Sequence, residues 1–144
     1  KKCGYPYARR ASKGDKMNKH TQNGSKTWFV ADGYLPLKER TEDAGFEGHE
    51  AIMILNCNED NATVLMDVYY EDKEPVENIE LEVPAKRIHS FRMDHPDEIG
   101  GVQIARLEQY ALRFRSDVEV IVQYGRMDIT QPNLAYIGCM GYAD

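Results

Sequence analysis

The clearest pattern along the chain is an alternation of apolar and polar residues, which is typical of β-strands with one buried face. Between positions 62 and 70 every second side chain is apolar or aromatic: Ala62, Val64, Met66, Val68 and Tyr70. Between positions 79 and 83 three aliphatic residues alternate with two glutamates, and Pro84 ends the run. Both segments are therefore predicted to be strands, the second with carboxylates on its solvent side.

Further short segments with strand character are separated by turn residues. The apolar run at 50–56 predicts a central strand buried on both faces, and Ser116-Asp117 predicts a turn between two paired strands. Other strands are predicted at 27–31, 86–93, 110–115, 118–124 and 134–140. Residues 103–112 have helical spacing and form the one competing helix. Seven or eight short strands predict an all-β protein, an antiparallel β-sandwich in a single domain.

Charge divides the chain at about residue 27. The segment 1–27 has eight basic residues and one acid, Asp15, whereas the whole chain has a net charge of −6. Little apolar periodicity occurs in this segment, so we predict a flexible basic N-terminal tail over 1–27 and the folded domain over 28–144. An acidic domain repels phosphate backbones, so nucleic-acid binding is expected only through the tail.

Cysteine content and hydrophobic runs bear on the cellular setting. Cys3, Cys57 and Cys139 are odd in number and widely spaced, which does not suggest a disulfide framework. Cys57 and Cys139 lie in or beside apolar runs, so we expect buried thiols. The longest apolar run, Ala51 to Leu55, is far shorter than a membrane-spanning helix. A reduced, cytoplasmic location without a secretory signal is the expectation.

Common catalytic and cofactor motifs are absent from the sequence. It contains no phosphate-binding P-loop, no G-x-G-x-x-G after a strand and no G-x-S-x-G elbow. His49-Glu50 begins like a zinc-protease motif, but Met53 and Ile54 follow where that motif needs its second histidine. On a strand, His49 and Glu50 would also point to opposite faces. We therefore expect no enzyme activity, no catalytic residues, no cofactor and no metal.

Polar residues near the end of the predicted 118–124 strand form the candidate ligand-binding site. Gln123, Arg126 and Asp128 are predicted to project to one side as a row with an amide, a cation and an anion. One interpretation is a structural ion pair and hydrogen-bond row; the other is a patch that binds a hydroxylated or anionic small molecule. In the second interpretation Trp28 or Tyr34 would lie nearby as the aromatic surface.

Several sequence blocks, taken in order, resemble the soluble sensory rhodopsin transducer family. The similarity covers about residues 28–144 without a gap near the C-terminus. It rests on Ala31-Asp32-Gly33-Tyr34-Leu35-Pro36, Tyr69-Tyr70-Glu71-Asp72-Lys73-Glu74-Pro75, Val83-Pro84-Ala85-Lys86-Arg87, the 116–123 segment and Arg126-Met127-Asp128. Two positions depart from the family pattern. Thr130 stands where the family usually has arginine, and the histidine expected near Ser90 is instead at His89.

The resemblance implies an antiparallel β-sandwich that forms a homotetramer and has no known catalytic activity. It also implies binding to the cytoplasmic side of a membrane sensory rhodopsin and relay of its signal. Folds of this kind are similar to carbohydrate-binding modules, so a binding module for a sugar-like or other small ligand is the alternative. A sugar-modifying enzyme is a third class, which would need the Gln123, Arg126 and Asp128 row in a pocket with a perturbed acid.

Overall fold

The computed structural model describes residues 23–38, 45–131 and 133–144. Most of the predicted tail, up to residue 22, lies outside the described residues. The first strand, β1 (Ser25–Tyr34), begins two residues earlier than the predicted Thr27. Ser25 and Lys26 thus belong to the folded domain, because Ser25 already pairs with Val120.

The described chain consists almost entirely of strands. After β1 come β2 (His49–Asn56), β3 (Ala62–Tyr70), β4 (Val76–Val83), β5 (Arg87–Arg92), a short 3₁₀ helix η1 (Pro96–Glu98), β6 (Gln109–Asp128), β7 (Ala135–Met140) and β8 (Tyr142–Ala143). None of the described segments is a helix with the length and apolar character needed to cross a membrane. The all-β prediction is confirmed.

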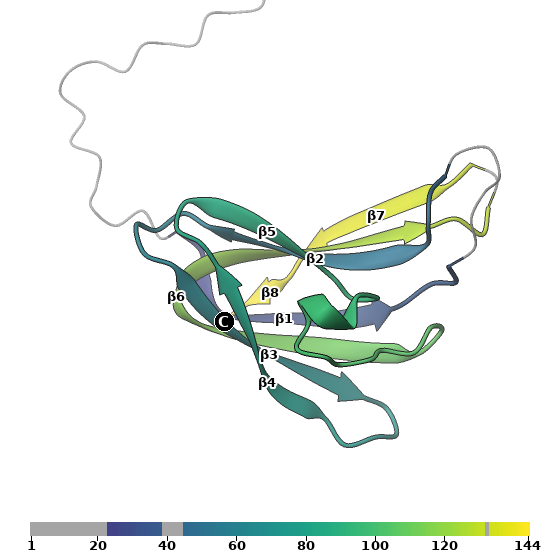
Figure 1. Cartoon of the computed structure of the whole chain (residues 1–144), viewed down its shortest axis with the longest axis horizontal. Coiled ribbons are helices and arrows are strands. Elements are labelled where there is room, and N and C mark those ends of the chain that lie inside the picture. Colours follow the sequence, from purple (N-terminus) through teal and green to yellow (C-terminus); the bar gives the residue numbers. More distant parts are fainter. Residues whose placement is uncertain (1–22, 39–44, 132) are drawn as a thin grey trace, which may run out of the picture.

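The long strand β6 belongs to both halves of the fold. Its first part pairs with β1 and β3, and its second part pairs with β2 and β7, always antiparallel. One sheet therefore folds over at β6 into two wings, with strand orders β4-β3-β6-β1-β8 and β5-β2-β6-β7. Figure 1 shows β6 curving at one end of the molecule and running into both wings. The two wings face each other as a β-sandwich.

The predicted turn at Ser116-Asp117 is wrong, because the chain bends there without leaving the sheet. Ser116 still pairs with Val64 in β3, and Val120 already pairs with Ser25 in β1. The Asp117 carboxylate accepts the backbone N–H of Thr63 at 2.9 Å instead of closing a tight turn. Two predicted strands thus merge into one of 20 residues.

The competing helix at 103–112 does not form. Leu107 has a positive φ of 63°, which an α-helix does not allow, and its N–H donates to the Leu35 carbonyl at 2.8 Å. From Gln109 onward the chain is strand β6.

The hydrophobic core fills the space between the wings. In β3 the predicted inward set from Ala62 to Val68 is fully buried. In β4 the three predicted inward residues, Ile79, Leu81 and Val83, are buried, while Glu80 and Glu82 are exposed. The other wing contributes Ile52 and Ile54 from β2. The period-two predictions for these strands are confirmed.

The expectation of buried cysteines is wrong for the two cysteines that the structure describes; Cys3 lies outside the described residues. Cys57 is exposed just after the end of β2, and Cys139 is exposed on β7. Within the described residues β7 pairs only with β6, so it is an edge strand. Apolar composition did not predict burial there because nothing described covers this edge.

Candidate functional site

A fully buried glutamate, Glu50, lies at the centre of a hydrogen-bonded group between β1, β2 and β6. The Tyr110 hydroxyl donates to Oε2 of Glu50, and the Tyr124 hydroxyl donates to Oε1. The Arg126 Nε and the backbone N–H of Tyr34 also donate to Oε1, each at 2.9 Å. We call these five residues the Glu50 cluster.

Strand register explains why these side chains meet. Glu50 on β2 lies directly opposite Arg126 on β6, and Tyr124 is two residues before Arg126 on the same face. Tyr110 comes from the other end of β6, which reaches the same interior because the strand curves between the wings. As predicted, His49 points to the opposite face from Glu50; its ring Nδ1 lies 2.8 Å from the Glu47 carbonyl oxygen.

The pKa values of the groups in the Glu50 cluster keep its tyrosines and Arg126 protonated as hydrogen-bond donors to Glu50. Burial raises the pKa of the Tyr110 and Tyr124 hydroxyls, and the adjacent Glu50 carboxylate raises both further. Both tyrosines therefore remain neutral donors. Burial lowers the pKa of Arg126, but its hydrogen bonds and charge interactions with Glu50 and Tyr124 together raise that pKa above its usual value, so the guanidinium stays charged.

Arg126 connects this buried cluster to the surface. Its guanidinium carbon lies 5.6 Å from the ring centre of Tyr34 and 5.7 Å from that of Tyr124, within cation–π range. One terminal nitrogen lies 3.6 Å from Oδ1 of Asp32, whose side chain is 82% exposed. The cluster can thus hold a guanidinium in a fixed position below an exposed carboxylate.

The predicted row of Gln123, Arg126 and Asp128 does not share one side. Arg126 and Asp128 are two residues apart and share a face, whereas Gln123 is three residues before Arg126 and points the other way. Gln123 is exposed opposite Met53 and Met140. The same-side prediction was wrong because it ignored the odd spacing.

Asp128 does not form the predicted ion pair with Arg126. Its Oδ1 accepts the hydroxyl of Thr130 at 2.6 Å and the Thr130 backbone N–H at 2.8 Å. These two hydrogen bonds lower the pKa of Asp128. Among the described side chains, the ion-pair partners of Arg126 are Glu50 and Asp32.

The two predicted aromatic residues lie in different environments. Trp28 is only 7% exposed, and its ring N–H donates to the Ser25 and Val120 carbonyls at 3.0 and 2.9 Å. It is a core residue and offers no stacking surface. Tyr34 is half-buried beside Arg126. A role for Tyr34 and Arg126 in ligand binding stays a prediction.

Glu50 and Tyr110 were absent from the predicted site. One signal was present: Glu50 opens a strand that is otherwise apolar, and a buried carboxylate needs donors. Its partners could not be read from the sequence, since Arg126 is 76 positions away and Tyr110 is 60.

A second fully buried carboxylate, Asp67 on β3, has different partners. The Nε of Arg113 donates to Oδ2 at 2.7 Å, and a terminal nitrogen of Arg115 donates to Oδ1 at 3.0 Å. The Asn78 backbone N–H donates to Oδ1 at 2.8 Å. Burial raises the pKa of Asp67, but these hydrogen bonds together lower it below its usual value.

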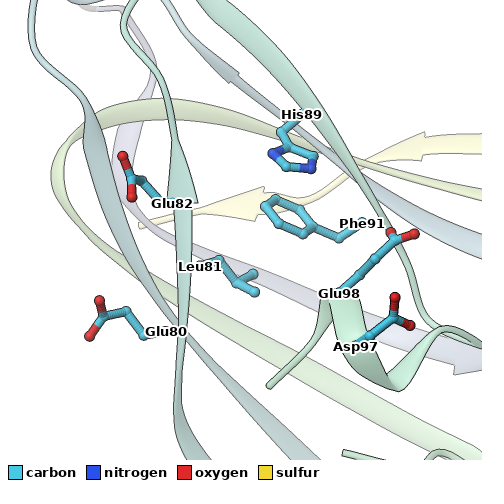
Figure 2. Close-up of a pocket in the computed structure, with 7 residues that line it drawn as sticks. All are labelled: Glu80, Leu81, Glu82, His89, Phe91, Asp97 and Glu98. Carbon is cyan, nitrogen blue, oxygen red and sulfur yellow. The ribbon is translucent and has the colours of Figure 1, made fainter. Parts of the chain in front are cut away.

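A groove of about 360 Å³ lies on the open side of the sandwich, between β4, β5 and η1. Leu81 and Phe91 point toward each other across it, and the His89 ring stacks on Phe91 with 4.1 Å between ring centres (Figure 2). Four carboxylates flank it: Glu80 and Glu82 on the outer side of β4, and Asp97 and Glu98 on η1. No lysine or arginine lines this groove among the described residues.

Within the described ranges, no three His, Cys, Asp or Glu side chains are arranged to hold a metal ion.

Comparison with protein families matches residues 23–143 to the Anabaena sensory rhodopsin transducer (ASRT) family. The chain belongs to this family. The match includes every residue of the Glu50 cluster and of the groove.

Solved structures support the ASRT assignment. The Anabaena sensory rhodopsin transducer is 34% identical and matches with a TM-score of 0.62, over 76% of this chain and 94% of that one. A crystal structure of Thermotoga maritima 1070 is 26% identical, with a TM-score of 0.73 over 85% of this chain and 97% of that one. No curated protein matches significantly. The resemblance noted from the sequence is thereby confirmed.

Proposed function

We propose that this ASRT-family protein is a cytoplasmic, non-enzymatic signal relay that binds a membrane sensory rhodopsin. The observation that carries the proposal is the family match over residues 23–143. The likeness to the Anabaena sensory rhodopsin transducer, which spans nearly the full length of that chain, adds support. The class of partner is taken from the names of these relatives.

The Glu50 cluster favours a structural role over catalysis. Both oxygens of Glu50 already accept hydrogen bonds, and the two tyrosines beside it are held neutral. A general acid or base needs a proton that it can exchange with a substrate. The cluster instead joins β1, β2 and β6 in a fixed geometry, which suits a rigid binding scaffold.

We also propose that the protein is a homotetramer and that β7 and β8 contribute to its subunit interface. The exposed large apolar side chains of this edge are Tyr136, Ile137, Met140 and Tyr142. Tyr142 is 72% exposed, and such a cluster on one edge is typical of an interface. Light scattering should give a tetrameric mass; a monomeric mass would contradict this part of the proposal.

The test of the main proposal is direct binding to a rhodopsin. The full chain would be titrated onto Anabaena sensory rhodopsin in lipid nanodiscs, with empty nanodiscs as the control. We expect saturable binding to the rhodopsin nanodiscs alone, and a change in the rhodopsin photocycle on binding. Equal signals from both kinds of nanodisc would contradict the proposal.

A cavity of about 220 Å³ supports the alternative, a module that binds a sugar-like molecule. Its lining includes Tyr69, Tyr70 and Tyr110, together with the polar residues Gln109 and Glu71. Aromatic rings with a few polar groups are typical of sites for hydroxylated ligands. A melting-temperature shift with a sugar, abolished in Tyr70→Ala, would favour this function.

A further inference from the structure

The groove between β4, β5 and η1 lies where the two wings of the sandwich present unpaired edges. Within the described residues, β4 pairs only with β3, and β5 pairs only with β2. The outer edge of β4 therefore has backbone groups to which an extended segment could hydrogen-bond, as in β-strand addition. Such a segment would cover the groove, because the groove opens beside β4.

The side chains of β4 define which segment fits. Leu81 faces the groove and the core, whereas Glu80 and Glu82 lie on the outer face (Figure 2). In an added strand, alternate side chains would face these two sides in turn. Apolar side chains would then lie over Leu81, Phe91 and the stacked His89, and the intervening ones would lie beside the glutamates.

The negative charge along the outer edge of β4 indicates which kind of partner can bind there. Like charges opposite each other in a sheet repel, so Glu80 and Glu82 disfavour pairing with the β4 of a second copy. The side-chain carboxylates of Glu80 and Asp97 have no hydrogen-bond or ion-pair partner among the described residues. The Glu82 carboxylate accepts a hydrogen bond from the neutral amide of Asn61 at 2.9 Å, which leaves its charge uncompensated. By contrast, the buried Glu50 and Asp67 are both paired with arginine. The groove is thus complementary to lysine or arginine.

We propose that the outer edge of β4 binds an extended segment of the partner in which basic and apolar residues alternate. This rests on the proposed function, which supplies a membrane protein as the partner. Cytoplasmic loops of membrane proteins are rich in lysine and arginine. The basic residues pair with Glu80 and Glu82, and the apolar residues cover Leu81, Phe91 and His89.

The test uses two fluorescent peptides of identical composition. In one, arginine and valine alternate; in the other, all arginines precede all valines. Anisotropy titrations of the full chain should show that the alternating peptide binds more tightly, and that high salt weakens its binding. His89→Ala, at an exposed position, should weaken the alternating peptide only.

A pair of charge-matched variants locates the binding. Glu80→Gln/Glu82→Gln should weaken the alternating peptide about fivefold, the loss expected for two exposed ion pairs. Asp72→Asn/Glu74→Gln removes the same charge from the exposed β3–β4 connection and should leave binding unchanged. An equal loss in both variants, or equal affinity for both peptides, would overturn the proposal.

Two further outcomes separate this inference from the proposed function. If Glu80→Gln/Glu82→Gln binds rhodopsin nanodiscs as well as the unaltered chain, the β4 inference fails and the transducer function stands. If the nanodiscs never bind but the alternating peptide shows the expected pattern, the rhodopsin partner fails and the β4 site stands. If the peptide binds only after Arg9, Arg10 and Lys13 are changed to glutamine, the basic segment of this chain is the occupant and the proposal is overturned.

Discussion

Glu50 and Asp67 are both fully buried, yet the protein satisfies them in opposite ways. Asp67 has two arginines, Arg113 and Arg115, whose side chains are 33% and 39% exposed. Among the described residues Glu50 has one arginine partner, Arg126, and its other side-chain donors are neutral tyrosine hydroxyls. Asp67 is thus compensated by two partly exposed arginines, and Glu50 by a single arginine that is less exposed.

The contrast between the two carboxylates indicates where the stability of the fold depends on one side chain. A buried ion pair is costly to break on one side, because the remaining charge is left without its partner in a medium of low dielectric constant. Around Asp67 a second arginine remains after either one is removed, and this reduces the cost. Around Glu50 nothing described replaces Arg126, so the Glu50 cluster is predicted to be the more sensitive of the two.

The largest effect is expected for Arg126→Ala. It leaves Glu50 with neutral donors only and should lower the free energy of unfolding by about 3–5 kcal/mol. Arg115→Ala, the matched change at Asp67, should cost less because Arg113 remains. Chemical denaturation of both variants measures this difference, and equal losses would contradict the contrast between the two carboxylates.

The Arg126→Ala variant also separates the two interpretations of Arg126. If its role is structural, the melting temperature falls while any ligand-induced shift is preserved. If Arg126 binds the ligand, the melting temperature stays unchanged and the shift is abolished. The contacts with Glu50 lead us to expect the first result.

The next effect is expected from the tyrosines. Tyr110→Phe removes the hydroxyl that, among the described side chains, alone donates to Oε2 of Glu50. It should cost about 1.5–3 kcal/mol, the range for hydrogen bonds to charged groups. Tyr124→Phe should cost less, because Arg126 and the Tyr34 N–H still donate to Oε1. A larger loss for Tyr124→Phe in denaturant unfolding would contradict this order.

A smaller, pH-dependent effect is expected at Asp67. Because its folded-state pKa lies below the unfolded value, its contribution is present above about pH 4 and is lost as the pH falls through the folded-state pKa. Asp67→Asn should therefore destabilise the protein at neutral pH by about 1–2 kcal/mol, the size of one or two hydrogen bonds. Toward pH 3 the difference between the two proteins should shrink.

Unfolding curves from neutral to acidic pH measure the Asp67 contribution. Asp94 and Glu98 also have lowered pKa values, so the unaltered protein and the variant should both lose stability in acid. The informative quantity is the difference between them. A difference that stays constant with pH would show that the Asp67 charge contributes nothing.

The smallest effect is expected for Gln123→Ala. Gln123 is exposed on the face opposite Arg126, so its removal should change the free energy of unfolding by no more than about 0.5 kcal/mol. It is the natural control for Arg126→Ala, since both residues lie on the same strand. A loss as large as that of Arg126→Ala would mean that the assignment of faces in β6 is wrong.

The strands with one buried face were predictable because their burial follows from local alternation alone. In β4 Ile79, Leu81 and Val83 are buried and the two intervening glutamates are exposed, as the sequence indicates. The candidate site was predicted less well. Arg126 and Tyr34 lie together, but Gln123 points to the opposite face and Trp28 is in the core. The face to which a side chain points depends on its spacing along the strand, and its burial depends on what packs against that face.

The all-β character, the strand faces of β3 and β4, and the resemblance to the family could all be predicted from the amino-acid sequence alone. These depend on local periodicity and on short blocks of neighbouring residues that resemble those of the family. Only the tertiary structure decided that two predicted strands are one continuous β6, that Glu50 pairs with Arg126, and that the edges of β4 and β5 border a groove. The physical reason is that these features join residues far apart in sequence, whose contacts depend on strand register and on the packing of the two wings.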